Sequence, residues 1–181
     1  MATADDPIAK LINEGDHRQA VEQCVEVYGA AIGRLCMAML GSQSDAEEVA
    51  QETLLAAHKT MSNYRGDGSV KAWLFGIARR QCARYLERNV GKHKHLRVVD
   101  EPTAESGPDS ELATARRAAS VRAALALLKP SERETLILRY QAELSFREIA
   151  AACGIEEAAA RKRASRGLQH LRNTLSREGV E

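Results

Sequence analysis

Residues 44–89 of the chain, SDAEEVAQETLLAAHKTMSNYRGDGSVKAWLFGIARRQCARYLERN, predict two amphipathic helices joined by a glycine-containing loop. In the first helix, apolar side chains recur at steps of three and four residues and share one face, which we expect to lie in the core. This face consists of Ala46, Val49, Ala50, Thr53, Leu54, Ala57 and Met61. Ser44 followed by Glu47 predicts a capping box where this helix starts.

The opposite face of this helix is acidic but contains one leucine. A turn of about 100° per residue groups Asp45, Glu48, Gln51, Glu52 and Leu55. An exposed leucine within an acidic rim predicts a contact with a partner protein.

The second helix is basic, and Ser69 is its predicted N-cap. Its apolar side is formed by Val70, Leu74, Ile77, Ala78 and Tyr85. Beside it, Arg80, Arg84 and Arg88 follow one another at intervals of four residues. Residues 65–97 carry a local net charge of +7, although the formal net charge of the whole chain is only +1. This concentration of cations predicts a surface that binds a polyanion.

The composition suits one or two small helical domains of a soluble protein: 181 residues, 44% hydrophobic, 28% charged and only 4% aromatic. The sequence contains neither an apolar run of roughly 18 residues nor a recognisable signal peptide, so we expect a cytoplasmic protein. The four cysteines are scattered and are expected to act as small buried hydrophobes. A redox or metal role is the minor alternative, because His93 and His95 near Cys82 are too loosely spaced for zinc. No cofactor is expected.

Residues 98–112, VVDEPTAESGPDSEL, hold two prolines, a glycine and five acids without any Lys or Arg. Such a segment cannot bury enough apolar surface to fold alone, so it predicts a flexible linker between domains at 1–97 and 113–181.

The C-terminal part predicts a helix over 113–128, a break at Lys129–Pro130 and a further helix with a capping box at Ser131 and Glu134. Residues 144–175, LSFREIAAACGIEEAAARKRASRGLQHLRNTL, then predict a helix-turn-helix, with Ser145 and Glu148 capping its first helix and Gly154 at the turn. The inward positions of its second helix are Ala160, Ala164, Leu168, Leu171 and Leu175. Its outward positions are Lys162, Ser165, Arg166 and Gln169, with Arg161 and Arg163 at the flanks. This face suits a recognition helix in a major groove.

Both halves resemble one family. The runs DAEEVAQE, NYRGDGS and KAWLFGIARRQCARYL, preceded by predicted helices over 6–13 and 17–40, resemble region 2 of a bacterial RNA polymerase sigma factor of the extracytoplasmic-function (ECF) group. The segment ALALLKPSERETLILRYQAELSFREIAAACGIEEAAARKRASRGLQHLR resembles region 4 of the same family. The resemblance implies an all-α fold of two small helical domains and a function in promoter-specific transcription initiation.

The resemblance also assigns sites to the two halves. It implies that the core polymerase contacts are Asp45, Glu48, Gln51, Glu52 and Leu55. For the minus-ten promoter element it implies Asn63, Tyr64, Arg65, Asp67, Ser69, Arg80, Arg84 and Arg88, with a pocket for a flipped base between residues 63–69 and Arg80. Trp73, at the border between the apolar face of the second helix and Arg80, is expected to be a core residue. For the minus-thirty-five element it implies Arg161, Lys162, Arg163, Ser165 and Arg166.

The family further implies an acidic linker that threads toward the RNA exit channel, although a passive tether is equally compatible with the residues. Its expected partners are the β and β′ subunits of core polymerase, promoter DNA and an anti-sigma factor, without membrane insertion. The chain departs from the family pattern at residues 158–160, which are three alanines where a Gly-Thr-Val run is usual, and at Arg80 and Arg84, where Asn and Asp are frequent. These departures leave the promoter sequence open.

The two alternative function classes are a helix-turn-helix regulator and an enzyme. A helix-turn-helix regulator that acts without polymerase would bind its operator alone, whereas the halves of a sigma factor bind duplex DNA poorly without polymerase. The sequence offers no nucleophile with a base, no phosphate-binding glycine loop and no metal-ligand set, so an enzyme is not expected.

Overall fold

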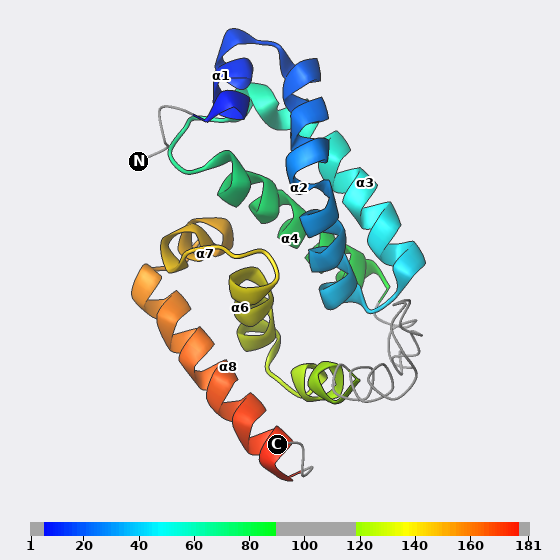
Figure 1. Ribbon diagram of the computed structural model, residues 1–181, viewed down its shortest axis with the longest axis vertical. Helices are drawn as coiled ribbons and strands as arrows, with labels where there is room; N and C mark the ends of the chain where they lie inside the picture. Colours follow the sequence, from blue (N-terminus) through cyan, green and yellow to red (C-terminus); the bar gives the residue numbers. More distant parts are fainter. Residues whose placement is uncertain (1–5, 90–118, 178–181) are drawn as a thin grey trace, which may run out of the picture.

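The computed structural model describes residues 6–89 and 119–177, and within these ranges every regular element is a helix (Figure 1). The predicted all-α class is therefore confirmed. The predicted linker, the ends of the two predicted domains beside it, and the pair His93 and His95 lie outside the described residues.

The N-terminal half consists of α1 (Pro7–Glu14), α2 (His17–Leu40), α3 (Gln43–Thr60), the short 3-10 helix η1 (Met61–Asn63) and α4 (Val70–Arg88). Gly15 and Gly41 end α1 and α2 in the left-handed conformation, with φ of 83° and 74°. Ser69 caps α4 as predicted, because its hydroxyl accepts a hydrogen bond from the Ala72 amide at 3.1 Å. The first two helices also follow the predicted spans closely.

The predicted capping box of α3 is wrong. The N-cap is Ser42, whose hydroxyl accepts from the Asp45 amide, and Ser44 already lies inside the helix. Because Gly41 terminates α2, Ser42 can start the next helix at once, and Glu47 instead accepts a hydrogen bond from the side chain of Gln43. The predicted core face of α3 is correct, with Ala46, Val49, Thr53 and Ala57 buried.

The C-terminal half contains a helical segment at 119–126, α6 (Pro130–Tyr140), α7 (Phe146–Cys153) and α8 (Glu157–Arg177). The capping box predicted at Ser131 and Glu134 is also wrong. Pro130 occupies the first turn of α6 directly after Lys129, so the helix begins before Ser131. The Glu134 carboxylate reaches across to the N-terminal half instead.

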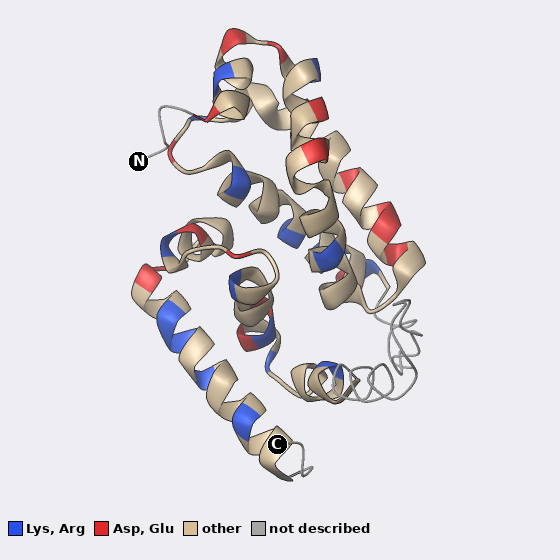
Figure 2. Cartoon of the chain, in the orientation of Figure 1, with Lys and Arg blue, Asp and Glu red and all other residues tan. Residues whose placement is uncertain are grey.

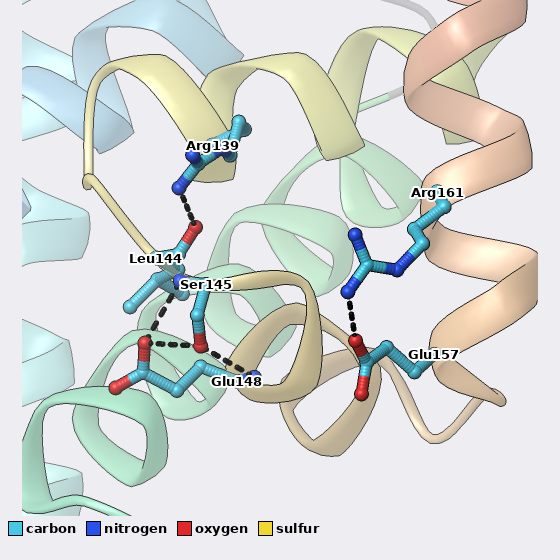
Figure 3. A network of polar contacts seen from close by, with 6 residues as sticks. All are labelled: Arg139, Leu144, Ser145, Glu148, Glu157 and Arg161. Carbon is cyan, nitrogen blue, oxygen red and sulfur yellow. Dashed lines mark hydrogen bonds and ion pairs between the residues drawn. The ribbon is translucent and has the colours of Figure 1, made fainter.

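The helix-turn-helix consists of α7 and α8, and its first cap is as predicted (Figure 3). Ser145 and Glu148 form a complete capping box, and Gly154 ends α7 with φ of 64°. Arg139 of α6 donates to the Leu144 carbonyl at 2.9 Å, which holds the turn between α6 and α7. The face of α8 that meets α6 differs from the prediction at one position: Leu168 is 39% exposed, and the neighbouring Gly167 is buried in its place.

The two halves pack against each other along α4. In Figure 1, α4 lies between the α2–α3 pair and the C-terminal helices, where it contacts α7. Gly76 of α4 lies so close to α7 that a Cβ there would be 3.5 Å from the Cα of Ala152. One apolar core therefore continues from Phe75 of α4 to Leu138 and Ile149 of the C-terminal half.

Candidate nucleic-acid interface

A cavity of about 260 Å³ lies where the loop before α4 meets the first turns of that helix. Its lining includes five of the residues predicted for the minus-ten element: Asn63, Tyr64, Arg65, Asp67 and Arg80. Ala151 and Ala152 of α7 form the remaining wall, so the C-terminal half covers part of the cavity. The cavity thus lies at the predicted place, but it has a wall that the local sequence did not indicate.

An aromatic pair forms one side of this cavity. The ring centroids of Tyr64 and Trp73 are 5.4 Å apart, with the planes inclined at 59°. The Tyr64 hydroxyl donates to the Gly68 carbonyl at 2.6 Å, which fixes the ring and closes the loop. Burial raises the pKa of Tyr64, so the neutral hydroxyl persists as a donor. Trp73 is half-buried: it packs on the core, as expected from the sequence, and it also lines the cavity.

The arginines of α4 divide into two groups. Arg80 lines the cavity, and its pKa is lowered by burial and by the neighbouring charges of Arg79 and Arg84. Arg88 instead turns back toward α3, where its Nη2 lies 3.7 Å from Oε2 of Glu52. Neither Arg84 nor Arg88 lines the cavity. Arg80 is therefore the arginine of this row that brings a positive charge to the cavity.

Acidic residues follow one another along α3 (Figure 2), and two of them are engaged by residues of α4. Leu55 is 61% exposed, and Glu48 and Gln51 are exposed beside it. Asp45 is half-buried and accepts a hydrogen bond from Tyr85, which is the main reason that the pKa of Tyr85 is raised to about 12. Glu52 pairs with Arg88. The apolar centre of the predicted partner face therefore remains open.

Helix α8 carries Lys and Arg at several positions along its length (Figure 2). Lys162 and Ser165 are exposed, whereas Arg163 is half-buried. Arg161 forms an ion pair with Glu157 (Figure 3), and its guanidinium carbon lies 4.8 Å from the centroid of the Phe146 ring. Nε of Arg166 lies 3.8 Å from Oε1 of Glu132 on α6. The five predicted residues share one helix, and two of them are oriented by acids.

Sequence reasoning missed the polar contacts that join the halves. Nε of Arg79 lies 2.6 Å from Oε1 of Glu134, and the two side chains are only 24% and 13% exposed. Ser69, predicted to contact DNA, donates to Oε1 of Glu148 at 2.5 Å. The partners are far apart in the chain and carry no shared motif, so no local pattern could have paired them.

All four cysteines are free; Cys24, Cys36 and Cys82 are buried as expected, whereas Cys153 is half-buried against the core. Among residues 6–89 and 119–177, three or more His, Cys, Asp or Glu side chains never gather as a metal would require. In the same ranges, the helices are too short or too polar to cross a membrane.

Comparison with known proteins agrees with this arrangement. The family model of Sigma-70 region 2 matches residues 24–91, and that of Sigma-70, region 4 matches residues 118–171. The ECF RNA polymerase sigma factor SigD of Mycobacterium tuberculosis strain H37Rv is 31% identical over 170 residues, which cover 90% of this chain and 80% of SigD. The ECF RNA polymerase sigma factor SigE of Mycolicibacterium smegmatis is 26% identical and covers 98% of this chain and 72% of its own length. These relatives are transcription initiation factors.

Among solved structures, CnrH in complex with the cytosolic domain of CnrY has a similar fold, with a TM-score of 0.70 and 24% identity over 93% of this chain and 95% of that chain. The sigma factor RpoE of Bartonella quintana, in complex with the anti-sigma factor NepR, gives a TM-score of 0.68 and 22% identity, covering 86% and 96% of the two chains. Fold, both family regions in order, and the full-length relatives agree. The chain therefore belongs to the ECF group of the sigma-70 family, the sigma factors of bacterial RNA polymerase.

Proposed function

We propose that this sigma factor docks on core RNA polymerase through the outer face of α3, captures a base of the minus-ten element in the cavity beside α4, and reads the minus-thirty-five element with α8. The observation that carries this proposal is the cavity itself. The cavity has a volume of about 260 Å³, and its lining combines aromatic rings, the polar side chain of Asn63 and the positive charge of Arg80. The cytoplasm, where polymerase acts, is the proposed location.

Base capture explains why these residue types gather there. A base is most fully exposed to recognition once it leaves the duplex, and the cost of unstacking is recovered by stacking and hydrogen bonds in a pocket. Tyr64 and Trp73 supply the apolar ring surface, and Asn63 and Asp67 supply polar edges. Arg80 and Arg84 supply a cationic path for the single strand on the adjoining helix.

The described conformation has its polymerase face open and its minus-ten face covered. Ala151 and Ala152 wall the cavity, and the Ser69–Glu148 and Arg79–Glu134 contacts fasten α7 and α6 beside it. A DNA strand that follows α4 into the cavity would displace these contacts. We propose that polymerase binds first through α3 and that promoter capture requires the halves to separate.

An anti-sigma factor is the proposed regulator. CnrH and RpoE, whose structures resemble this chain, were each solved in complex with a second protein, the cytosolic domain of CnrY and the anti-sigma factor NepR. A protein of this kind that favours the docked arrangement would keep the minus-ten cavity covered, because a ligand shifts an equilibrium toward the state it binds better.

The proposal is tested by transcription with reconstituted holoenzyme on a matched promoter, either fully duplex or pre-melted by a mismatch bubble. Arg80→Ala and Arg84→Ala should fail on the duplex, and the bubble should partly restore both, because it removes the opening step. Arg18→Ala is the matched control, since Arg18 is an exposed arginine of α2 paired with Glu22. Wild-type transcription by both variants on both templates would remove α4 from the opening step.

A second measurement separates this function from that of a regulator working alone. The tagged protein should retain the β and β′ subunits of polymerase from a bacterial lysate, and it should select promoter DNA only in their presence. Tight, specific binding to duplex DNA by the free chain would favour the regulator instead.

A further inference from the structure

Helices α6 and α8 approach each other closely at Gly167. A Cβ at this position would lie 2.9 Å from Cδ1 and 3.2 Å from Cγ of Leu136, so any other residue would force the leucine to move. The glycine therefore sets the distance between the recognition helix and α6. Arg166 and His170 flank it on α8.

This close approach brings both flanking side chains onto one acid of α6. Glu132 is only 2% exposed. Its Oε2 lies 2.9 Å from Nδ1 of His170, and its Oε1 lies 3.8 Å from Nε of Arg166. Each carboxylate oxygen thus has its own partner on the recognition helix.

A buried carboxylate is costly unless its charge is compensated. Glu132 lies in the first turn of α6, where the helix dipole favours an anion, and the two α8 side chains supply the remaining compensation. The side chains of Arg166 and His170 are 54% and 48% exposed, so they reach from the buried acid to the surface.

The arginine atom nearest to Glu132 shows which part of the guanidinium remains available for DNA. Arg166 approaches the acid with Nε, which leaves Nη1 and Nη2 at the far end of the guanidinium. These two terminal nitrogens can form the bidentate contact with O6 and N7 of guanine that is the commonest specific contact in the major groove. An acid that holds Nε therefore orients the arginine for base reading instead of removing it from use.

We propose that Glu132 is a positioning residue for base recognition: buried beneath the recognition helix, it fixes Arg166 so that the terminal guanidinium nitrogens face a guanine of the minus-thirty-five element. This inference rests on the proposed reading of that element by α8. Fixing a long side chain before binding reduces the conformational freedom lost in the complex, so the preference for one base becomes sharper.

The test is a binding-site selection by holoenzyme with a randomised minus-thirty-five element. Arg166→Ala should relax the preference at one position by about tenfold or more. Glu132→Gln, which keeps the shape and removes the charge, should relax the same position by a smaller factor. The double variant should match Arg166→Ala alone, because the acid acts through the arginine. Glu22→Gln, the same change on α2, should leave the selected sequence unchanged.

Glu132→Met guards against a folding defect, since an apolar residue of similar size is often tolerated where a buried ion is removed. It should relax the same position while the thermal midpoint stays near that of the wild type. If both Glu132 variants weaken all sequences equally, or keep the full base preference, Glu132 does not position Arg166. If Arg166→Ala itself selects the wild-type sequence, the reading role of Arg166 fails, and the positioning role fails with it.

Discussion

The outer face of α3 and the cavity beside α4 belong to the same helical half, but the C-terminal half covers only the cavity. Leu55 on α3 is 61% exposed, whereas Arg79 on α4 is 24% exposed and paired with Glu134. A partner can reach α3 without any rearrangement, whereas in the function proposed above a DNA strand enters the α4 cavity only after α7 moves. The difference indicates that two surfaces of one sigma factor can be made available in sequence by the position of the other half.

The largest effect is expected from a charge placed between the halves. Ala152 is 6% exposed and packs on Gly76, so Ala152→Arg would bury a cation without a partner and should separate the halves. If the covered form outweighs the open form nine to one, opening raises the affinity for a single-stranded minus-ten oligonucleotide about tenfold. Fluorescence anisotropy measures this affinity, and X-ray scattering should show a larger radius of gyration. Ala158→Arg, at an exposed position of α8, is the control. An unchanged radius and affinity would mean that α7 does not restrict the cavity.

A smaller effect is expected at the open face. Leu55→Ala should weaken binding to core polymerase by about 2 kcal/mol, because the substitution removes most of the apolar side-chain area that Leu55 would bury in the interface. Glu48→Gln should mainly change the association rate and its salt dependence. Titration of labelled core polymerase distinguishes the two. Ala152→Arg should leave this affinity unchanged, because the outer face of α3 is already open. Equal affinity for Leu55→Ala and the wild type would mean that α3 does not provide the polymerase contact.

The smallest effect is a pH dependence of the contact between the halves. Burial alone would raise the pKa of Glu148, but hydrogen bonds from Ser69 and Ser145, aided by Lys71, leave it below its usual value. A lowered pKa in the folded protein means that this group stabilises the contact above the ordinary glutamate pKa, and that the contribution disappears as pH falls through the lowered value. Scattering at neutral and acidic pH should show the halves loosening below about pH 4, and Glu148→Gln should flatten the response near that pH. If Glu148→Gln shows the same change of scattering with pH as the wild type, other carboxylates cause the pH dependence.

Local features of the fold were predictable, and long-range ones were not. The caps at Ser69 and Ser145 follow from contacts within three residues, so the sequence pattern is sufficient. The same pattern misled at Ser44 and Ser131, because a serine followed by a glutamate can also lie inside a helix that an earlier Ser42 or Pro130 has already started.

The candidate site shows the same division. The loop residues of the cavity are neighbours in sequence, and their resemblance to a family was enough to locate them. The wall formed by Ala151 and Ala152 depends on how the C-terminal half packs against the N-terminal half. The local sequence around two alanines does not indicate this packing. The exposure of Leu168 also depends on tertiary packing, since α8 turns a glycine toward α6 to come closer than a leucine would allow.

The carboxylate of Glu148 has a consequence beyond its charge. One oxygen accepts from the backbone and hydroxyl of Ser145 at the start of α7, and the other accepts from Ser69, which itself caps α4. A single side chain thus connects the first turns of two helices, although Ser69 and Glu148 are 79 residues apart in the chain. Separation of the halves therefore changes the hydrogen bonding at the beginning of α4, next to the loop that lines the cavity. Movement of the two halves and rigidity of the loop are therefore coupled through Glu148, and the loop is held most firmly while α7 covers the cavity.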